Sequence, residues 1–344
     1  MVTVETKNTP SPVERTSIPN LYVLERKTNI DERGFFREVV EKRDLEEKLG
    51  RSLSFVQWNH YHTKGLLKKD LSANQDKIVY VACGTASIIV EASEQGTRRF
   101  NNKECFVLGE ENKRALFLPR GVDGSLVTLG SQAADIFCAL TREDNNYVPF
   151  ASLSTDIEGL KVLKYHQRIT NGGCLQQIFR ESDLINILPG QTGLVQWNHS
   201  RSFPGVIRGF HAEPWNKLVY VPRGKVLSVV ADLRPESATF GKVVAQTLGD
   251  GSPQALYISR GLANSFCALE ESDYNYFVTA YFEGKPTPSV VWNDPLLTRQ
   301  FGGWRVENPL VSNTDRKHPT LWEKFHDTVD FSQYPWLSSR GGTR

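Results

Sequence analysis

The sequence lacks any apolar run approaching the roughly 20 residues that a membrane-spanning helix needs. Its opening stretch, MVTVETKNTPSPVERTS, also lacks the basic and then apolar pattern of a secretory signal, and we expect residues 1–17 to form a disordered lead. Positive and negative side chains nearly balance, giving a formal net charge of +2. We therefore expect a cytoplasmic protein that has neither nucleic acid nor a membrane as its partner.

Cysteine is scarce, and the cysteines that occur are scattered. They form no CxxC pair and no zinc-ligand spacing, and their number is odd: Cys83, Cys105, Cys138, Cys174 and Cys267. An odd, scattered set without a secretory signal is typical of reduced thiols. A disulfide-stapled or zinc-stabilised domain is therefore disfavoured.

What the chain does contain is an internal repeat, which indicates duplicated architecture. Ile18–Leu24 matches Ile157–Leu163 at an offset of 139 residues. Gln57–His60 is repeated without change at Gln196–His199, at the same offset. Chance identity would not keep this register over so long a stretch, so we predict two homologous domains.

The offset then changes by one residue. Lys77 matches Lys217 at an offset of 140, and we place the insertion near Lys64–Gly65. The predicted domains cover residues 18–153 and 154–298.

Within each repeat, short β-branched runs such as KIVYVACG and KVLSVVADL alternate with turn residues. Runs of this length and spacing predict an all-β fold. A jelly-roll barrel is the most economical choice, because it closes most sheet edges. We expect two tandem jelly-roll, cupin-like barrels that form an intrachain pseudo-dimer, and further homodimerisation stays open.

Two segments depart from this strand pattern. Glu41–Leu49, followed by Gly50, is the one helix that the sequence predicts, since its charged run ends at a helix-stopping glycine. Residues 299–344 lie outside the repeat and carry Trp304 and Trp322. We expect this C-terminal extension to pack on the second barrel.

Polar motifs occur along the chain in a definite order: Arg33–Glu38 (RGFFRE), Gln196-x-Asn198, Arg208–His211 (RGFH), Lys217-Leu-Val, Arg260–Ala263, Tyr276, Trp292–Pro295 and Asp315. In order and spacing they resemble the dTDP-4-dehydrorhamnose 3,5-epimerase family of cupin-type isomerases. The resemblance covers about residues 18–320, once per repeat. It implies a nucleoside-diphosphate 4-keto-6-deoxyhexose as substrate, deoxysugar biosynthesis as the setting, and no cofactor.

Epimerisation beside a ketone has definite chemical needs. A base must remove a weakly acidic hydrogen, a cation or donor must stabilise the enolate, and an acid must return a proton to the opposite face. By resemblance, His211 is the base and Asp315 holds its ring and stabilises the imidazolium. Tyr276 is then the opposite-face acid, and Lys217 stabilises the C4 oxyanion.

The same resemblance implies a set of substrate-binding residues. Arg208 would pair with the diphosphate through its planar guanidinium. The family's arginine–aromatic–glutamate segment completes the partner's nucleotide site in its dimers, so we expect the first repeat to supply that segment to the second barrel. The predicted binding residues are Arg208, Gln196, Asn198, Asn264, Arg260, Tyr281, Arg33, Phe36 and Glu38.

Each repeat has lost what the other retains. In the first repeat we align Lys68 with Arg208, Leu71 with His211 and Ile136 with Tyr276. Leucine cannot take a proton and isoleucine cannot give one, so the first barrel is predicted to be inactive. The second repeat has GGCLQQ, residues 172–177, in place of RGFFRE.

One position departs from the family pattern. Asn264 stands where the family usually has a second histidine, and asparagine carries no proton or charge near pH 7. Epimerisation at C3 and C5, at one of them only, or ketoisomerisation of another sugar nucleotide all remain open.

Two other classes are weaker alternatives. His60 and His62 form an HxH pair on one strand face, which a metal-dependent cupin would use, yet no further ligands follow at suitable spacing. We therefore expect no metal. A sugar-nucleotide binder without activity is disfavoured by the intact set of His211, Lys217 and Tyr276.

Overall fold

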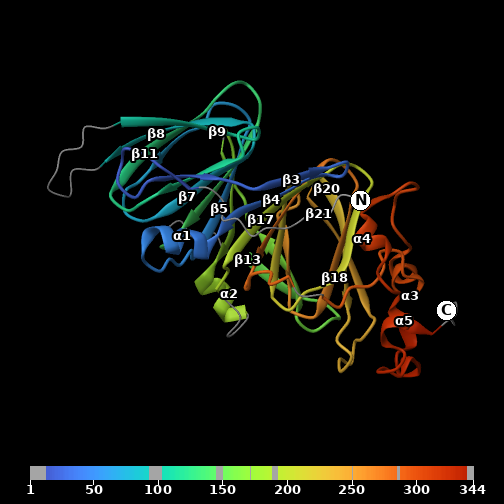
Figure 1. Cartoon of the computed structure of the whole chain (residues 1–344). Helices are drawn as coiled ribbons and strands as arrows, with labels where there is room; N and C mark the ends of the chain where they lie inside the picture. Colours follow the sequence, from blue (N-terminus) through green and yellow to red (C-terminus); the bar gives the residue numbers. More distant parts are fainter. Residues whose placement is uncertain are drawn as a thin grey trace, which may run out of the picture. The chain divides into compact units, whose positions relative to one another are not determined.

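The computed structural model describes residues 13–92, 103–144, 150–170, 172–187, 193–249, 251–284 and 287–338. The chain divides into two compact units. The first unit comprises Met1–Thr28, Glu38–Tyr147 and Gln167–Asp183; the second comprises Asn29–Arg37, Val148–His166 and Leu184–Arg344. Each unit is built on two β-sheets of the jelly-roll type, which confirms the predicted all-β class (Figure 1).

The first unit contains an eight-stranded and a four-stranded sheet, both antiparallel. The eight-stranded sheet runs, in spatial order, through β1 (Val13–Arg15), β2 (Tyr22–Glu25), β10 (Arg114–Leu118), β7 (Lys77–Cys83), β12 (Ala134–Leu140), β5 (Gln57–Thr63), β16 (Gly173–Arg180) and β15 (Arg168–Thr170). The second runs through β6 (Lys68–Leu71), β11 (Val122–Thr128), β8 (Thr85–Ala92) and β9 (Lys103–Gly109). β1 lies within the predicted lead of residues 1–17, of which residues 1–12 are outside the described part.

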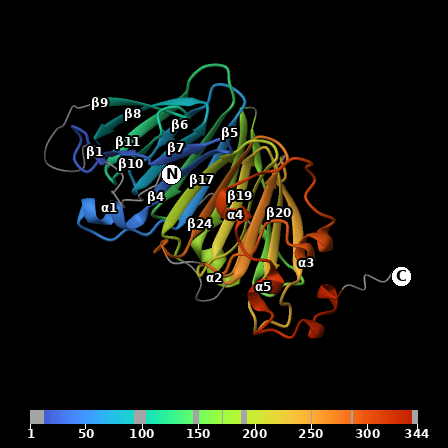
Figure 2. The same cartoon turned by 45° about the vertical axis from the view of Figure 1, so that its right-hand side comes forward.

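The second unit repeats this plan, and Figure 2 shows β17, β24 and β19 side by side within it. Its eight-stranded sheet runs through β13 (Phe150–Ser154), β14 (Leu160–Tyr165), β22 (Gln254–Ile258), β19 (Lys217–Arg223), β24 (Ser272–Val278), β17 (Gln196–Ser202), β4 (Gly34–Glu41) and β3 (Thr28–Asp31). Its five-stranded sheet runs through β21 (Val243–Gly249), β20 (Lys225–Asp232), β23 (Leu262–Ala268), β18 (Val206–Ala212) and β25 (Leu310–Val311). A core of aliphatic and aromatic side chains from both sheets fills the interior.

The predicted helix is confirmed as α1 (Lys42–Leu49), which ends at Gly50 in the left-handed conformation that glycine adopts readily. A second helix, α2 (Glu181–Ile187), lies at the repeat counterpart of α1, where the sequence pattern predicts none. Three short helices follow in the C-terminal part: α3 (Pro295–Thr298), α4 (Asn313–Arg316) and α5 (Leu321–Phe325). Among the helices described, none is long and apolar enough to cross a membrane.

Two segments are exchanged between the repeats in the compact units of the structure. Residues 29–37 precede most of the first repeat, yet they belong to the second unit, where β4 pairs with β17. Residues 167–183 belong in turn to the first unit, where β16 pairs with β5. Each eight-stranded sheet therefore gains edge strands from the other repeat.

Strand register also corrects the position of the one-residue insertion. It is a β-bulge in β18 rather than an insertion near Lys64–Gly65. Arg208 lies opposite Phe266 and His211 opposite Asn264, so two residues of β18 face one residue of β23 between these pairs. In the first unit the equivalent strand is regular, with Lys69 opposite Leu126. Lys69, not Lys68, is therefore the counterpart of Arg208.

A second shift corrects the counterpart of Tyr276. Tyr276 lies opposite Asn198, and the residue opposite Asn59 in the first unit is Cys138. The turn before β24 is two residues shorter than the turn before β12, which moves the alignment by two positions. The prediction of Ile136 is therefore wrong, and a buried thiol takes the place of the phenol.

The C-terminal extension covers the outer face of the five-stranded sheet of the second unit. Leu321, Phe325 and Leu337 join one hydrophobic cluster with side chains of β18, β20 and β23. The sequence of β20 explains why the extension packs here. Leu227, Val229 and Ala231 form an apolar row that faces the extension, and each is at most 3% exposed. The matching residues of β8 are Ser87, Ile89 and Glu91, of which Ile89 is 47% exposed.

One face of β17 carries a buried charged cluster with Asp273 of β24. His199 Nε2 is 2.9 Å from Asp273 Oδ1, and Arg201 donates to both carboxylate oxygens over 2.7 and 2.9 Å. Burial opposes ionisation, but His199 and Arg201 more than offset it and lower the pKa of Asp273. Burial also lowers the pKa of His199, so the nearest cation that balances the carboxylate is Arg201, with Arg223 3.9 Å away.

This cluster predicts a pH dependence of stability. Because the pKa of Asp273 is lower in the folded state, its ionisation stabilises the fold above the unfolded value of about 3.9, and this stabilisation is lost as the pH falls below that value. We expect the urea midpoint to fall steeply below about pH 4 and the Asp273→Asn variant, less stable at pH 7, to show a flatter acid limb. Asp156→Asn, at an exposed carboxylate, is the control. Parallel acid limbs for Asp273→Asn and the wild type would contradict the prediction.

Candidate active site

A pocket of about 150 Å³ in the second unit gathers the predicted base, the predicted acid and the lysine predicted to stabilise the oxyanion. Side chains from both sheets line it, so groups can approach a bound molecule from two directions. The lining residues are Phe36, Ser200, Arg208, His211, Glu213, Lys217, Asn264, Phe266, Tyr274 and Tyr276.

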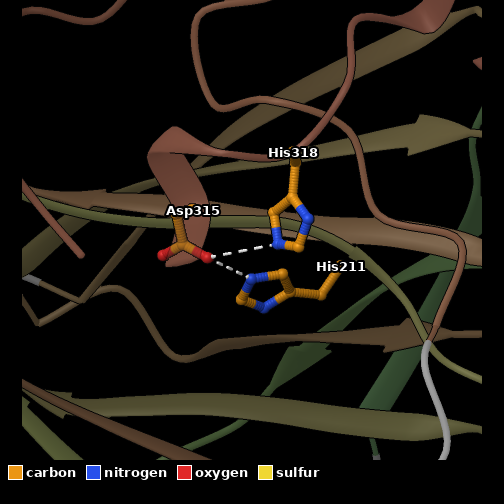
Figure 3. A group of neighbouring side chains, drawn as sticks. All are labelled: His211, Asp315 and His318. Atoms are coloured by element: carbon orange, nitrogen blue, oxygen red, sulfur yellow. Dashed lines mark hydrogen bonds and ion pairs between the residues drawn. The ribbon is translucent and has the colours of Figure 1, made fainter. Parts of the chain in front are cut away.

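His211 and Asp315 form a hydrogen-bonded pair, although 104 residues separate them. His211 Nε2 lies 2.7 Å from Asp315 Oδ1 (Figure 3). Asp315 belongs to α4, whose N-cap Ser312 accepts from the Asp315 backbone N–H, and this short helix fixes the carboxylate. Burial raises the pKa of Asp315, but hydrogen bonding and the charge of His211 more than offset this, so the net pKa is lowered. A carboxylate that stays ionised can hold the ring in the Nε2–H tautomer, leaving Nδ1 as the basic atom.

A second imidazole shares this carboxylate. His318 Nε2 is 3.8 Å from Asp315 Oδ1, and both histidine rings point toward that oxygen (Figure 3). One ligand atom from each of the three residues lies within 4.8 Å of the others, so the group has a composition that could hold a divalent metal. Burial and then the charge of His211 lower the pKa of His318, which favours the neutral form of the His318 ring.

Lys217 and Tyr276 lie on the eight-stranded sheet, whereas His211 lies on the five-stranded sheet. Lys217 Nζ is 4.9 Å from the Tyr276 ring centroid and forms an ion pair with Glu213. The side chain of Lys217 is only 7% exposed, so its charge acts where water is largely excluded. The predicted base and acid thus come from different sheets and line the same pocket.

One end of the pocket is cationic and aromatic. The ring of Phe36 stacks on Tyr276 with centroids 6.5 Å apart. Burial and then the like charge of Arg33 lower the pKa of Arg208, so the positive field of Arg33 reaches this lining side chain. Asp31 accepts from Arg33 Nε over 3.1 Å and offsets part of this charge. The arrangement suits a multiply charged anion beside a planar ring.

Asn264 faces the pocket beside His211, its direct neighbour across the two strands. Its Oδ1 accepts a hydrogen bond from the Tyr274 hydroxyl over 3.0 Å. Burial raises the pKa of Tyr274 well above its ordinary value, so the phenol stays protonated and can keep this bond. The amide is therefore a fixed polar group rather than a proton carrier.

Several predicted binding residues lie outside the lining of this pocket. Gln196 donates to Asn198 over 2.9 Å, on the same strand face as the lining residue Ser200. Arg260 is exposed, and its backbone N–H donates to Asn216.

The remaining three binding residues are placed differently. Tyr281 lines a separate apolar cavity of about 400 Å³ with Trp215. Glu38 belongs to the first unit. Arg33 does not line the pocket, although its charge acts on the lining residue Arg208.

The pocket also contains residues that sequence reasoning missed: Ser200, Glu213, Phe266 and Tyr274. His318, which contacts Asp315, was missed as well. Two of them have a detectable signal. Glu213 lies four residues before Lys217, and Ser200 lies two after Asn198 on the same strand face. Nothing in the spacing of His318 points to His211.

The HxH pair of the first unit shares one buried carboxylate. His60 and His62 both contact Asp135, over 2.9 and 2.8 Å, with His62 in the place that Arg201 holds in the second unit. These contacts hold the pKa of Asp135 at about 2, although burial works to raise it. The two imidazoles repeat the charged cluster of the second unit.

Comparison with known families gives a clear match. The sequence profile of the dTDP-4-dehydrorhamnose 3,5-epimerase family matches residues 15–149 and again 154–323. Both repeats are therefore covered, in agreement with the predicted duplication.

Individual relatives match about half of the chain. The dTDP-4-dehydrorhamnose 3,5-epimerase of Shigella flexneri is 34% identical over 148 residues, 42% of this chain and 80% of the relative. That of Neisseria gonorrhoeae is 35% identical over 169 residues, 47% of this chain and 50% of the relative. Among solved structures, dTDP-6-deoxy-D-glucose-3,5-epimerase from Legionella pneumophila, in complex with dTDP-4-keto-L-rhamnose, is 27% identical, with a TM-score of 0.48 over 54% of this chain and 98% of that one.

Proposed function

Because this chain belongs to the dTDP-4-dehydrorhamnose 3,5-epimerase family, we propose that its second unit inverts carbon next to the C4 ketone of a nucleoside-diphosphate 4-keto-6-deoxyhexose, with dTDP as the nucleotide. The observation that carries the proposal is the 2.7 Å contact of His211 with the buried Asp315, in a pocket that also contains Lys217 and Tyr276. Together these four groups match the needs of enolate chemistry.

In the first step, Nδ1 of His211 takes the proton from the carbon beside the ketone. The C–H electron pair forms the enolate double bond, and the carbonyl electrons move to the C4 oxygen. Asp315 stabilises the imidazolium that results, and the Lys217 ammonium stabilises the enolate oxygen in a site that excludes most water.

In the second step, the Tyr276 hydroxyl gives its proton to the opposite face of the same carbon, and the C4 carbonyl re-forms. The phenolate then takes a proton from solvent while His211 releases its own, so the enzyme returns to its starting state. This proposal is supported by the positions of His211 and Tyr276 on different sheets.

The diphosphate and base would occupy the cationic, aromatic end of the pocket. Arg208 and Arg33 offer two planar donors for phosphate oxygens, and Phe36 offers a ring for stacking. The contribution of Phe36 comes from the first repeat through the exchanged strand β4.

Proton NMR in D₂O tests the proposal, with dTDP-4-keto-6-deoxyglucose as the probe. We expect solvent deuterium to appear at C3, at C5 or at both in the presence of the protein, and not with a His211→Ala variant. If no exchange occurs while dTDP still binds, the result would favour a sugar-nucleotide-binding protein without activity.

The position that is inverted depends on what Asn264 can do. Since a fixed amide cannot shuttle a proton, we expect exchange at one carbon to be much slower than at the other in the wild type. The Asn264→His variant should raise the slower exchange, whereas Asn264→Gln should not. Equal rates at C3 and C5 in the wild type would contradict this expectation.

A metal-dependent reaction is the competing mechanism, and the group of His211, Asp315 and His318 gives it a specific location. In the proposed mechanism Lys217 stabilises the enolate, so we expect dialysis against EDTA to leave the exchange rate unchanged. Loss of activity on chelation, restored by a stoichiometric divalent metal and abolished by His318→Ala, would favour the metal.

A further inference from the structure

The first unit contains a cationic pocket of about 230 Å³ to which the proposed reaction assigns no role. Its basic lining residues are His62, Lys68, Lys69 and Arg168, and no acidic side chain is among the described residues that line it. Gly172 and Gly173 also line the pocket, and a side chain at Gly173 would collide with the His62 carbonyl. A concentration of positive charge at a concave site favours an anionic ligand.

Strand register identifies this pocket as the counterpart of the nucleotide end of the proposed active site. Lys69 stands where Arg208 stands, and Leu175 on the exchanged strand β16 stands where Phe36 stands on β4. Arg33 has no basic counterpart, since Gly172 takes its place, but Arg168 on β15 supplies a cation from the same exchanged segment.

His62 lines the pocket as a hydrogen-bond donor whose charge is balanced by a buried carboxylate. Its Nδ1 contacts Asp135 over 2.8 Å, and this hydrogen bond raises the pKa of His62 above its ordinary value. Lys64 lies near enough to oppose that shift, which places another cation in the neighbourhood. The ring is therefore protonated over a wider range of pH than a free histidine, while about a third of the side chain remains exposed.

The first unit differs more at the positions that correspond to the catalytic residues of the second unit. Tyr61 stands in the place of Ser200, and it lines both the cationic pocket and a cavity of about 250 Å³ that contains Leu71, Lys77 and Cys138. Lys69 Nζ lies 4.6 Å from the Tyr61 ring centroid, and Lys69 also lines both cavities. Leucine replaces the base, and burial raises the pKa of Cys138 to about 11, so the thiol there stays protonated.

We propose that the first unit binds a nucleoside diphosphate, free or as part of a sugar nucleotide, without converting it. The shared chemistry is a diphosphate held by Lys69, Arg168 and His62. The choice of a nucleotide over another anion rests on the proposed function of the second unit, because the class of ligand is transferred between repeats.

Equilibrium dialysis of the full chain with dTDP tests the proposal. We expect two dTDP per chain in the wild type. In Lys69→Glu/Arg168→Glu one should remain, with the sugar-proton exchange rate of the second unit unchanged. The matched control is Lys27→Glu/Lys48→Glu, which changes the same charge at exposed positions of the first unit and should keep both sites.

A milder variant tests the same site with less risk of misfolding. Lys69→Gln should weaken one of the two sites about tenfold, since a charged hydrogen bond to phosphate is lost. Competition with inorganic pyrophosphate and with a dTDP-sugar distinguishes the sources of the diphosphate. Both should displace dTDP from the first unit, and displacement by pyrophosphate alone would contradict binding of a sugar nucleotide there.

One dTDP per chain in the wild type, or two that persist in Lys69→Glu/Arg168→Glu, would overturn the proposal. The outcome is separable from that of the proposed function. Binding of two dTDP per chain without proton exchange would contradict the proposed epimerase activity but support the proposed binding site in the first unit.

Discussion

Replacing His211 by alanine should slow exchange of the sugar proton by about 10²–10⁴-fold, the usual range for a positioned general base. The rest of the pocket should remain, because the His211 side chain is 35% exposed and its contact is with a helix that has its own cap. Binding of dTDP should therefore change little, so the loss should appear in kcat. Single-turnover exchange in D₂O, with binding measured in parallel, checks this expectation.

Two further variants sharpen the test. Asp315→Asn keeps the shape but removes the charge that holds the ring tautomer, so we expect a loss of the same order. His166→Ala, at an exposed histidine of the second unit, is the control and should keep full activity. Wild-type activity in His211→Ala would mean that another group is the base, and His318 would be the first to test.

Replacing Gly34 by alanine should destabilise the second unit by about 3 kcal/mol or more, a value at the high end for single substitutions. Gly34 has φ +124°, which side-chain-bearing residues rarely adopt, and a Cβ atom there would lie 2.3 Å from the Arg201 carbonyl oxygen. Since Gly34 begins β4, the strand should separate from β17 and take Phe36 out of the pocket. We expect a lower urea midpoint together with weaker dTDP binding.

Gly50→Ala is the matched control for this prediction. Gly50 also has a positive φ, of +64°, but a Cβ atom at this position would meet no atom of the described residues within 4 Å. Its substitution should cost only the backbone strain of about 1 kcal/mol and should leave dTDP binding unchanged. Equal losses in the two variants would show that φ, and not the contact with β17, decides the effect.

Much of this fold was predictable because the two repeats share identities at a constant offset. Identities locate strands, but they do not locate insertions that fall between them. The bulge in β18 and the shortened turn before β24 lie in stretches where the repeats have diverged. For that reason the sequence offset selects Lys68 and Ile136 in place of Lys69 and Cys138.

The candidate site was predictable where the residues belong to strands. Strand spacing brings Arg208, His211 and Asn264 to one pocket, and their order along the chain carries the family resemblance. His318 is different, since its position depends on how the segment after β25 folds back, and no periodic pattern encodes that. The resemblance also assigns Tyr281 to this pocket, whereas the structure places it at another cavity.

The exchange of edge strands has a consequence for how this protein is made. The ribosome completes β3 and β4 long before β17, the strand beside which β4 belongs, and β5 must wait for β16. Neither eight-stranded sheet can be completed while only the first repeat has emerged, and unpaired strand edges are prone to aggregate. Cutting the gene between the repeats should therefore give two insoluble products, whereas co-expressing the two halves should let each recover its missing edge.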